Sequence, residues 1–262
     1  VAALSLTAAT SGALGAAMVS SVSGSADEAA KEVNPLAKYE FKDTSNIGKD
    51  SMGKYDLTFR NAWKAGGTGD LLNEYTAIEG GGITFNNKLC LAADKDKNVF
   101  KDTSAVTMVL EVKMVSGSGT WGHIAGVGFA NAKSTGLSAH SAADGANHVR
   151  IASKGIDGLH GCWDSITAIN GELEKYHTII ISAQPGGKIR VWNDGVKLSE
   201  EKEVSATWTA YDENNMFSIG GEFNGAAAYT SAAAGAGGRR RPLRLALLKT
   251  GPCVNFTSPL KK

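Results

Sequence analysis

The segment YHTIIISAQPGGKIRVWNDGVKL, residues 176–198, decides which fold the chain is expected to adopt. It contains two runs rich in β-branched and aromatic residues, at 176–183 and 187–193, which predict two strands. Gln-Pro-Gly-Gly at 184–187 supplies turn-forming residues between the strands, and Asn-Asp-Gly at 193–195 supplies them after the second strand. The segment therefore predicts a β-hairpin with a second tight turn behind it.

Alternation along these runs predicts that each strand has one face in a core. In the second strand of the hairpin Ile189 and Val191 are expected on one face, and Arg190 and Trp192 on the other. A period of two is typical of half-buried antiparallel strands. The longest alternating run, at 105–114, places these apolar residues on one face: Val106, Met108, Leu110, Val112 and Met114.

Similar short runs recur between clusters of Gly, Asn and Asp. They predict further strands at 36–42, 55–60, 82–86, 122–130, 147–153 and 215–220. The segment between residues 35 and 225 has no convincing long helical period. Of the 262 residues, 42% are hydrophobic and 32 are Gly, which suits a core with many turns and excludes a collagen-like chain or a coiled coil. We expect an all-β, two-sheet antiparallel jelly-roll sandwich.

The order of these motifs resembles the laminin-G-like, concanavalin A-like lectin–glucanase family of jelly-roll domains. In that family an aromatic-His pair opens a buried strand, a Gly-containing turn follows, and the next strand ends in Asp-Gly. The matching segments here are YH at 176–177, PGG at 185–187, DG at 194–195, MFSIGG at 216–221, residues 39–59 and residues 81–94. The resemblance covers roughly residues 36–225 and implies a concanavalin A-like sandwich.

The resemblance ends after Gly225, where the family continues with a strand that closes one sheet. Residues 226–238 read AAAYTSAAAGAGG, in which ten of thirteen residues are Ala or Gly, and a basic segment follows. We interpret 226–262 as a low-complexity and basic tail. Our hypothesis for this change in composition is an altered reading frame or gene model, and the alternative is a genuine linker. LRLALL at 243–248 is a candidate edge strand.

The N-terminal segment is typical of a targeting sequence. No charged residue occurs between Val1 and Ala26, and this Ala-rich run ends in small residues. It predicts a secretory signal peptide over 1–26, with a disordered leader or a membrane anchor as alternatives. Residues 27–34 form a polar spacer, and the folded domain is predicted over 35–225. We therefore expect a secreted or surface-displayed protein with no membrane span in the mature chain.

Charge and cysteine content limit the partners further. Seven of the 27 basic residues lie in 226–262, which has no acid, so residues 1–225 carry 20 basic and 26 acidic side chains. This mildly acidic body is not typical of a nucleic-acid-binding protein. The three cysteines allow a bridge between Cys90 and Cys162 in an oxidising compartment. The sequence contains no Cys-x-x-Cys pair, so a thiolate zinc site is not expected.

Catalytic motifs of this fold are absent from the sequence. Glucanases of the family carry Glu-x-Asp-x-Glu on one strand, which holds two carboxylates about 5–5.5 Å apart. No Glu in this chain has an Asp two positions later, and Glu172 and Glu174 are interpreted as solvated loop charges. No polysaccharide-lyase motif or nucleophile elbow is found either. We expect no enzymatic activity, with a glycoside hydrolase or polysaccharide lyase on the same fold as the alternative.

Two segments of the sequence offer oxygen donors of the kind that calcium prefers. Residues 94–98 place oxygen donors at alternate positions, like the start of a calcium loop, but lack the Gly and Glu of an EF-hand. The 39–59 segment is similar to the family's Asp-rich first loop, for which the resemblance makes a structural calcium plausible. The candidate ligands are Asp43, Asp50, Asp94, Asp96 and Asn98. The alternative is that these residues form solvated turns.

Carbohydrate binding needs an aromatic face for the sugar ring and polar groups beside it for the hydroxyls. The places that combine such groups are the Gly-rich loop with His160, Trp163 and Asp164, the outward strand face with Arg190 and Trp192, and Trp121 with His123. The alternative is that these Trp residues only pack inside the sandwich, and His177 is interpreted as a residue that supports the core or a turn.

The predicted function is a secreted or surface-displayed, non-catalytic carbohydrate-binding or adhesion module. Its partner would be a glycan or a glycosylated surface protein, bound weakly at single sites and more strongly through multivalency. Besides the enzyme alternative, a structural or protein-contacting spacer domain stays open. The chain can serve any of these roles as part of a larger protein.

Overall fold

A computed structural model gives the fold. It describes residues 35–61, 75–85, 89–101, 103, 105–113, 122–127, 136–142, 148–153, 156, 159, 166–170, 172, 174–211, 216–220 and 242–248. The predicted signal peptide at 1–26 and spacer at 27–34 lie outside these residues. Within the described ranges the one helical element is the three-residue 3-10 helix η2 (Lys95–Lys97), and no helix there is long and apolar enough to cross a membrane.

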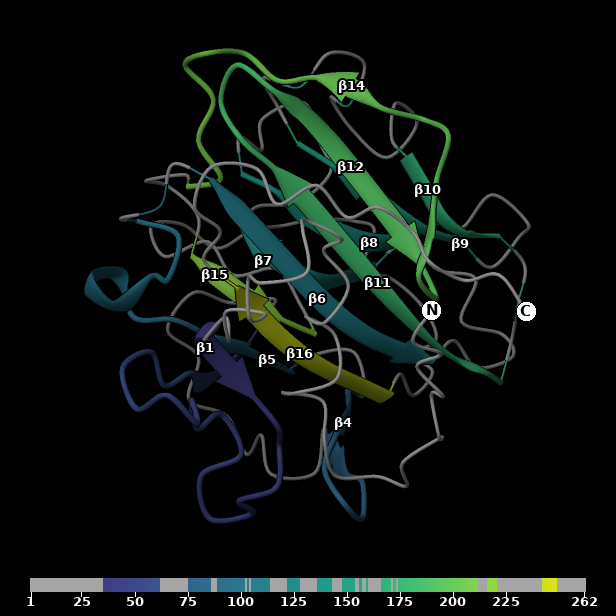
Figure 1. Cartoon of the computed structure of the whole chain (residues 1–262). Helices are drawn as coiled ribbons and strands as arrows, with labels where there is room; N and C mark the ends of the chain where they lie inside the picture. The colour runs from purple at the N-terminus through teal and green to yellow at the C-terminus, as the bar shows by residue number, and fades with distance from the viewer. Residues whose placement is uncertain are drawn as a thin grey trace, which may run out of the picture.

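The strands form two antiparallel sheets that lie in two layers, one in front of the other in Figure 1. The nine-stranded sheet has the path β13 (Val196–Lys197), β12 (Lys188–Asn193), β11 (Tyr176–Ala183), β6 (Val106–Lys113), β16 (Pro242–Leu248), β4 (Ile83–Phe85) and β3 (Tyr75–Ala77). Two further strands join it, with β1 (Pro35–Tyr39) paired to β16 and β14 (Lys202–Glu203) paired to β12.

The seven-stranded sheet forms the rear layer of Figure 1. Its order is β10 (Ile166–Asn170), β9 (His148–Ala152), β8 (Ser138–Ala142), β7 (Gly122–Val127), β15 (Phe217–Ile219), β5 (Leu89–Ala92) and β2 (Thr58–Asn61). β7, β8, β9 and β10 are consecutive in the chain, whereas β15 comes from far along the sequence and lies between β7 and β5. The predicted all-β, two-sheet antiparallel jelly-roll sandwich is thereby confirmed.

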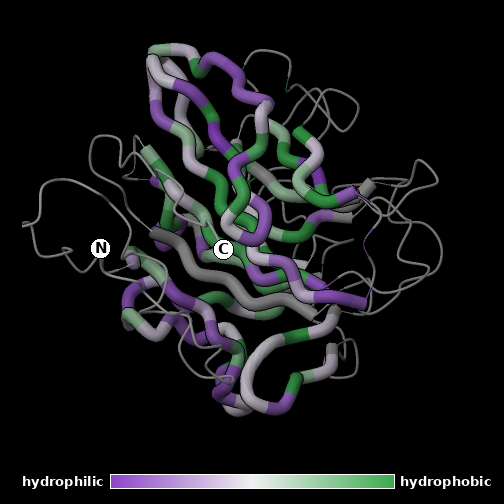
Figure 2. The backbone as a smooth tube through the Cα atoms, turned by 45° about the vertical axis from the view of Figure 1, so that its right-hand side comes forward, coloured by the Kyte–Doolittle hydropathy of each residue, from purple (hydrophilic) through white to green (hydrophobic). Residues whose placement is uncertain are grey.

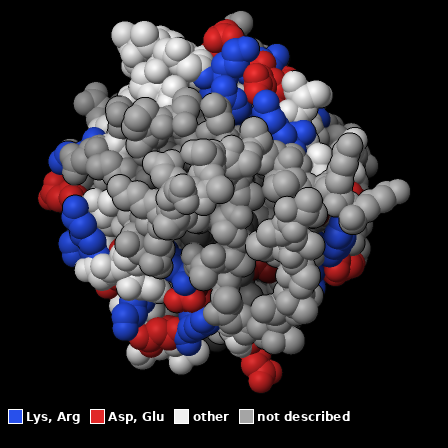
Figure 3. Space-filling model, in the orientation of Figure 1, with Lys and Arg blue, Asp and Glu red and all other residues white. Residues whose placement is uncertain are grey.

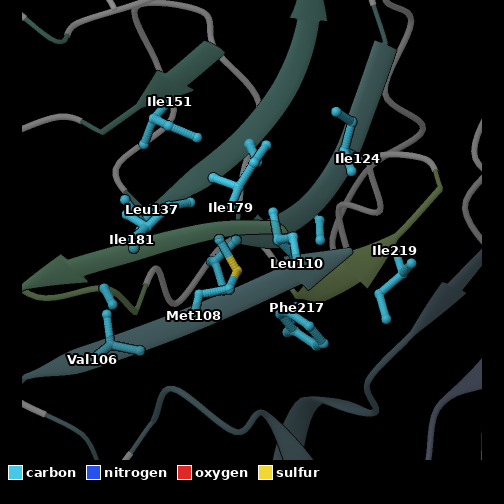
Figure 4. Close-up of a cluster of buried hydrophobic side chains, with 14 of the residues drawn as sticks. Val106, Met108, Leu110, Ile124, Leu137, Ile151, Ile179, Ile181, Phe217 and Ile219 are labelled. Atoms are coloured by element: carbon cyan, nitrogen blue, oxygen red, sulfur yellow. The ribbon is translucent and has the colours of Figure 1, made fainter. Parts of the chain in front are cut away.

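The core lies between the two sheets and follows from the alternation of apolar residues. The face of β6 predicted to be apolar contributes Val106, Met108, Leu110 and Val112, all buried. Figure 4 shows Val106, Met108 and Leu110 on the same side of β6 as side chains from the other sheet, such as Phe217. Hydrophobic and hydrophilic residues alternate along the strands in Figure 2, as expected where one strand face packs and the other does not.

The predicted hairpin forms as expected. β11 and β12 pair antiparallel over four positions, including Ile180 with Trp192. In the turn after β12, Asp194 has φ 49° and Gly195 has φ 80°, which is the left-handed pair that a type I′ turn requires. Asp tolerates this conformation better than most side chains, and Gly adopts it at no steric cost.

Several strands were not predicted. β3, β5, β8 and β10 lie outside every predicted strand, as do the two-residue strands β13 and β14. β8 has the sequence SAHSA, which contains no β-branched or aromatic residue, so its strand conformation depends on pairing with β7 and β9. Intrinsic preference alone would not identify such a segment.

β16 corrects the expectation that residues 243–248 form only an edge strand. It lies inside the nine-stranded sheet, paired with β6 over six positions on one side and with β1 and β4 on the other. The sheet thus takes an internal strand from beyond residue 225, where the domain was predicted to end. Because β6 pairs with β16 on one side and with β11 on the other, it is not an open edge of the sheet.

Candidate functional site

β12 places Arg190 and Trp192 on the face of the nine-stranded sheet that points away from the core. Ile189 and Val191, which alternate with them, are buried in the core, so the predicted division of this strand is confirmed. Trp192 is not a member of that core, although only 5% of its surface is exposed. The register sets it between Ile180 of β11 and strand β13. The indole is therefore a sheltered group at the sheet surface.

A network of charges surrounds this face of β12. Arg190 Nε donates to Glu201 Oε1 at 3.2 Å, and Lys197 Nζ also contacts Oε1. Lys188 Nζ lies 3.7 Å from the other Glu201 oxygen and 3.2 Å from Glu203. The hydrogen bond from Lys197 lowers the pKa of Glu201 below its usual value, and the hydrogen bond from Arg190 adds a smaller lowering effect. Partial burial opposes this shift. Figure 3 shows the mixed signs, with blue and red side chains side by side at the top of the view.

The remaining candidate sugar-binding residues, His160, Trp163, Asp164 and Trp121, lie outside the described residues. The loop site at 157–165 therefore stays a prediction. Within that range the structure describes Leu159, which is fully buried and accepts a backbone hydrogen bond from Ser153 at 2.9 Å.

Asp50 is a buried carboxylate held by backbone N–H groups. Its Oδ1 accepts from the amides of Lys38 and Met52 at 2.8 and 3.0 Å. Its Oδ2 accepts from the amides of Lys54 and Tyr55 at 3.1 and 3.0 Å. Four donors match the four lone-pair positions of a carboxylate, so no position is left for a cation. The role of Asp50 in this conformation is to tie β1 to the loop that follows it.

The other candidate calcium ligands also lie in turns. Asp43 Oδ1 accepts from the amide and the hydroxyl of Ser45 at 3.0 and 2.6 Å, and these bonds hold the pKa of Asp43 below its usual value. Asp94 and Asp96 are exposed, whereas Asn98 is 2% exposed and its Oδ1 accepts the amide two residues later. Among the described residues no three His, Cys, Asp or Glu side chains are grouped so that they could hold a metal.

His177 supports the β11–β12 hairpin, in agreement with its interpretation from the sequence. The ring is buried, and Nδ1 lies 2.9 Å from Asp194 Oδ2. The other oxygen of Asp194 accepts from the amide of Thr178 at 2.9 Å. Nε2 lies 3.5 Å from Glu172, an exposed side chain paired with Lys175 at 3.1 Å. Glu172 is thus a solvated loop charge, as interpreted.

Sequence reasoning did not assemble the outer face of the seven-stranded sheet, the face away from the core. Strand register makes Thr167, Arg150, His140 and His123 successive partners across β10, β9, β8 and β7. Each alternates with core residues of its own strand, such as Ile151 beside Arg150. Alternation alone signals the outward positions, but the spatial order of the strands brings them into one row.

His123 is a buried member of this row, whereas Arg150 and Thr167 are half-buried. Only 4% of it is exposed, and Nε2 lies 3.0 Å from the carbonyl oxygen of Ser218, to which it donates. Burial lowers the pKa of His123 to about 4, although the Ser218 and Gly126 carbonyls favour the charged form. The ring is therefore neutral near pH 7, and its buried Nδ1 has no hydrogen-bond partner.

Cys90 lies on the same sheet and is fully buried. Its possible bridge partner Cys162 lies outside the described residues, so this bridge stays a prediction. The burial of Cys90 among strand residues fits a small apolar packing role.

Comparison with known proteins identifies relatives only at the level of fold. No protein-family model matches the sequence, and no curated protein matches it. Among solved structures, a Trypanosoma rangeli sialidase gives a TM-score of 0.55 at 14% identity, over 81% of this chain and 30% of that chain. The receptor binding domain of the botulinum neurotoxin C/D mosaic serotype gives 0.52 at 7% identity, over 84% and 48%. The binding domain of Paraclostridial Mosquitocidal Protein 1 gives 0.52 at 11% identity, over 84% and 50%.

This chain thus spans half or less of each of these proteins. At such identities the likeness concerns the fold alone. The antiparallel jelly-roll sandwich is shared with all three, and it is the most specific class to which these comparisons assign the chain.

Proposed function

We propose that this chain is a secreted or surface-displayed, non-catalytic module that binds a glycan or a glycosylated partner. The observation that carries the proposal is the position of Trp192, outside the core and beside Arg190. Only 5% of Trp192 is exposed, so it offers a sugar ring the apolar rim of its indole, and the half-buried guanidinium of Arg190 offers N–H donors to the hydroxyls. Sandwiches of the same fold include a toxin receptor-binding domain, which is consistent with a binding role.

Trp208 shows what a purely structural Trp looks like in this protein. It is also 5% exposed, but it belongs to the core between the sheets, and its Nε1 donates to Ser153 Oγ at 2.9 Å. Trp192 has the same low exposure on the opposite side of its sheet. A sugar would meet the rim of this sheltered indole and the half-buried Arg190, so we expect weak single-site affinity that multivalent display strengthens.

The proposed absence of catalysis rests on the sequence and on the pairing of acidic side chains. The Glu-x-Asp-x-Glu pattern is missing. Glu172 pairs with Lys175, Glu174 lies 3.9 Å from Lys113, and Glu201 is held by three cations. Incubation with a polysaccharide panel should release no new reducing ends. Product that disappears when one carboxylate is replaced would establish the glycoside hydrolase alternative.

A glycan array with the full chain tests the binding proposal. Arg190→Gln and Trp192→Leu should each weaken binding at least fivefold relative to the parent chain. Trp208→Phe and Lys202→Gln serve as matched controls, because they alter a core Trp and a surface Lys outside the proposed contact. An equal loss of glycan binding in Trp208→Phe would mean that the array reports the folding of the chain and not the proposed contact. A folded chain that binds no glycan would favour the protein-contacting or spacer alternative.

A structural calcium ion remains part of this proposal, carried by the resemblance and by the exposed donors Asp43, Asp94 and Asp96. Asp50 is unsuited to contribute because its lone pairs are occupied. If calcium binds at a loop edge, millimolar calcium should raise the thermal unfolding midpoint of the full chain and a chelator should reverse it. Identical midpoints under both conditions would remove calcium from the proposal.

A further inference from the structure

Glu201 is the carboxylate shared by the cations that border Trp192. Its Oε1 accepts from Arg190 Nε at 3.2 Å and contacts Lys197 Nζ, and its Oε2 lies 3.7 Å from Lys188 Nζ. Lys197 is the cross-strand partner of Trp192, and Arg190 precedes the indole by two positions on the same face of β12. Glu201 thus joins the two basic residues that flank the proposed sugar contact.

The carboxylate of Glu201 is ionised and within reach of a ligand. The hydrogen bond from Lys197 lowers its pKa below the usual value, so it carries a negative charge near pH 7. Side-chain exposure is 22% for Glu201, 28% for Arg190 and 41% for Lys197. A ligand at the rim of the sheltered indole therefore also meets these charged groups, and their chemistry decides which class of ligand is accepted.

The charges around Glu201 are almost balanced. Besides the three cations on Glu201, the network contains an ion pair of 3.2 Å between Lys188 and Glu203. A second pair of 3.2 Å joins Lys202 to Glu200. Four basic side chains thus meet three acidic ones, and Glu201 is the acid that the three cations nearest the indole share. A surface in which cations are already paired has little excess charge with which to attract an anion.

We propose that Glu201 makes the Trp192 face selective for an uncharged saccharide, whose hydroxyls bind between this carboxylate and Arg190. The inference rests on the proposed carbohydrate-binding function and adds a ligand class and a specificity-determining residue to it. A sugar hydroxyl can donate its O–H to the carboxylate while its oxygen accepts from the guanidinium, so it matches both members of the ion pair. An ionised sugar carboxylate only accepts hydrogen bonds and would approach the negative charge of Glu201, which disfavours it.

Removal of this one charge tests the selectivity. The full parent chain and Glu201→Gln are each titrated at low salt with polygalacturonate, a polymer of carboxylated sugars. The parent chain should bind it weakly, and Glu201→Gln should bind it about tenfold more tightly, because the cations lose the acid that they share. Added salt should remove this gain. A merely structural role of Glu201 would not create affinity for a polyanion.

Two further variants control for the position and the charge. Glu200→Gln removes the same charge from the adjacent residue, whose ion pair is with Lys202, and should gain no affinity for polygalacturonate. Glu201→Asp keeps a carboxylate on a shorter side chain and should disfavour the polymer as the parent chain does. An equal gain in Glu200→Gln, or no gain in folded Glu201→Gln, overturns the inference.

The glycan array of the parent chain supplies a measurement that needs no variant, and it decides the question should Glu201→Gln fail to fold. Among pairs of glycans that differ by one carboxylated sugar, the parent chain should prefer the uncharged member. Equal or stronger binding of the carboxylated members overturns this inference while the proposed glycan binding stands. Binding to no glycan overturns the proposed function, and this inference with it.

Discussion

At the scale of single residues, Asp50 is the clearest case of a side chain whose role depends on its partners. We expect Asp50→Asn to lower the free energy of unfolding by about 3 kcal/mol, because an amide group would turn a donor toward two backbone N–H groups. Urea unfolding of the full chain measures this. Asp43→Asn is the matched control, since Asp43 caps an exposed turn and its replacement should cost less than about 1 kcal/mol. Equal losses in both variants would contradict the assigned role of Asp50.

His123 should make stability depend on pH. Burial lowers the folded-state pKa of His123 to about 4 from the ordinary 6.5, so the unfolded chain takes up the proton first as the pH falls. The stabilisation is complete above pH 6.5 and is lost between pH 6.5 and 4, by up to about 3 kcal/mol.

Urea unfolding at a series of pH values between these limits measures the effect. His123→Gln keeps a donor for the Ser218 carbonyl but has no titrating group, so its stability should fall less steeply over the same range. Parallel pH profiles for the two chains would show that other groups cause the dependence.

Residue identity alone predicted neither of these roles. The sequence places Asp50 in an Asp-rich loop, where an acid can bind calcium or form a turn. The choice depends on which backbone amides approach the carboxylate, and those of Lys38 and Tyr55 come from both sides of the loop. His123 was weighed only as a neighbour of Trp121, because its register partners lie far away in the sequence.

At the scale of strands, the period of two was sufficient to locate a strand where its residues also have a high intrinsic preference for the strand conformation. β6, β11 and β12 combine β-branched residues with strict alternation, and all three lie where the sequence predicts them. β16 reads PLRLALL, with no β-branched residue, after a long Ala- and Gly-rich stretch. Pairing on both sides places it in the sheet, and tertiary pairing is information that local preference does not contain.

The internal position of β16 leads to a truncation experiment. A chain that ends after Gly225 should lose cooperative unfolding, because β6 and β1 would both lose their pairing with β16. A chain that ends after Lys249 keeps this strand and is the matched control. Circular dichroism during thermal unfolding measures both. A cooperative transition in the shorter chain would show that the sheet does not require residues beyond 225.

For the whole molecule, the sequence predicted the architecture but only some of the outward strand faces. Two stacked sheets follow from many short alternating strands with turn residues between them. The face with Arg190 and Trp192 was also predicted, since it needs alternation within a single strand. The outer row of the other sheet required the order β10, β9, β8 and β7, which makes Arg150 and His123 neighbours of His140. Strand order is a long-range property, so this surface emerges only from the folded chain.

The two sheets should unfold as one unit, because Phe217 joins them at the centre of the core. Its ring lies 6.0 Å from the Tyr39 ring of the nine-stranded sheet and 5.4 Å, edge to face, from Phe100. Phe217→Ala should lower the free energy of unfolding by about 3–5 kcal/mol and shift fluorescence and circular-dichroism midpoints together. The control Val196→Ala, at a side chain that is 64% exposed, should change it by less than about 0.5 kcal/mol. Separate midpoints for the two signals would mean that the sheets unfold independently.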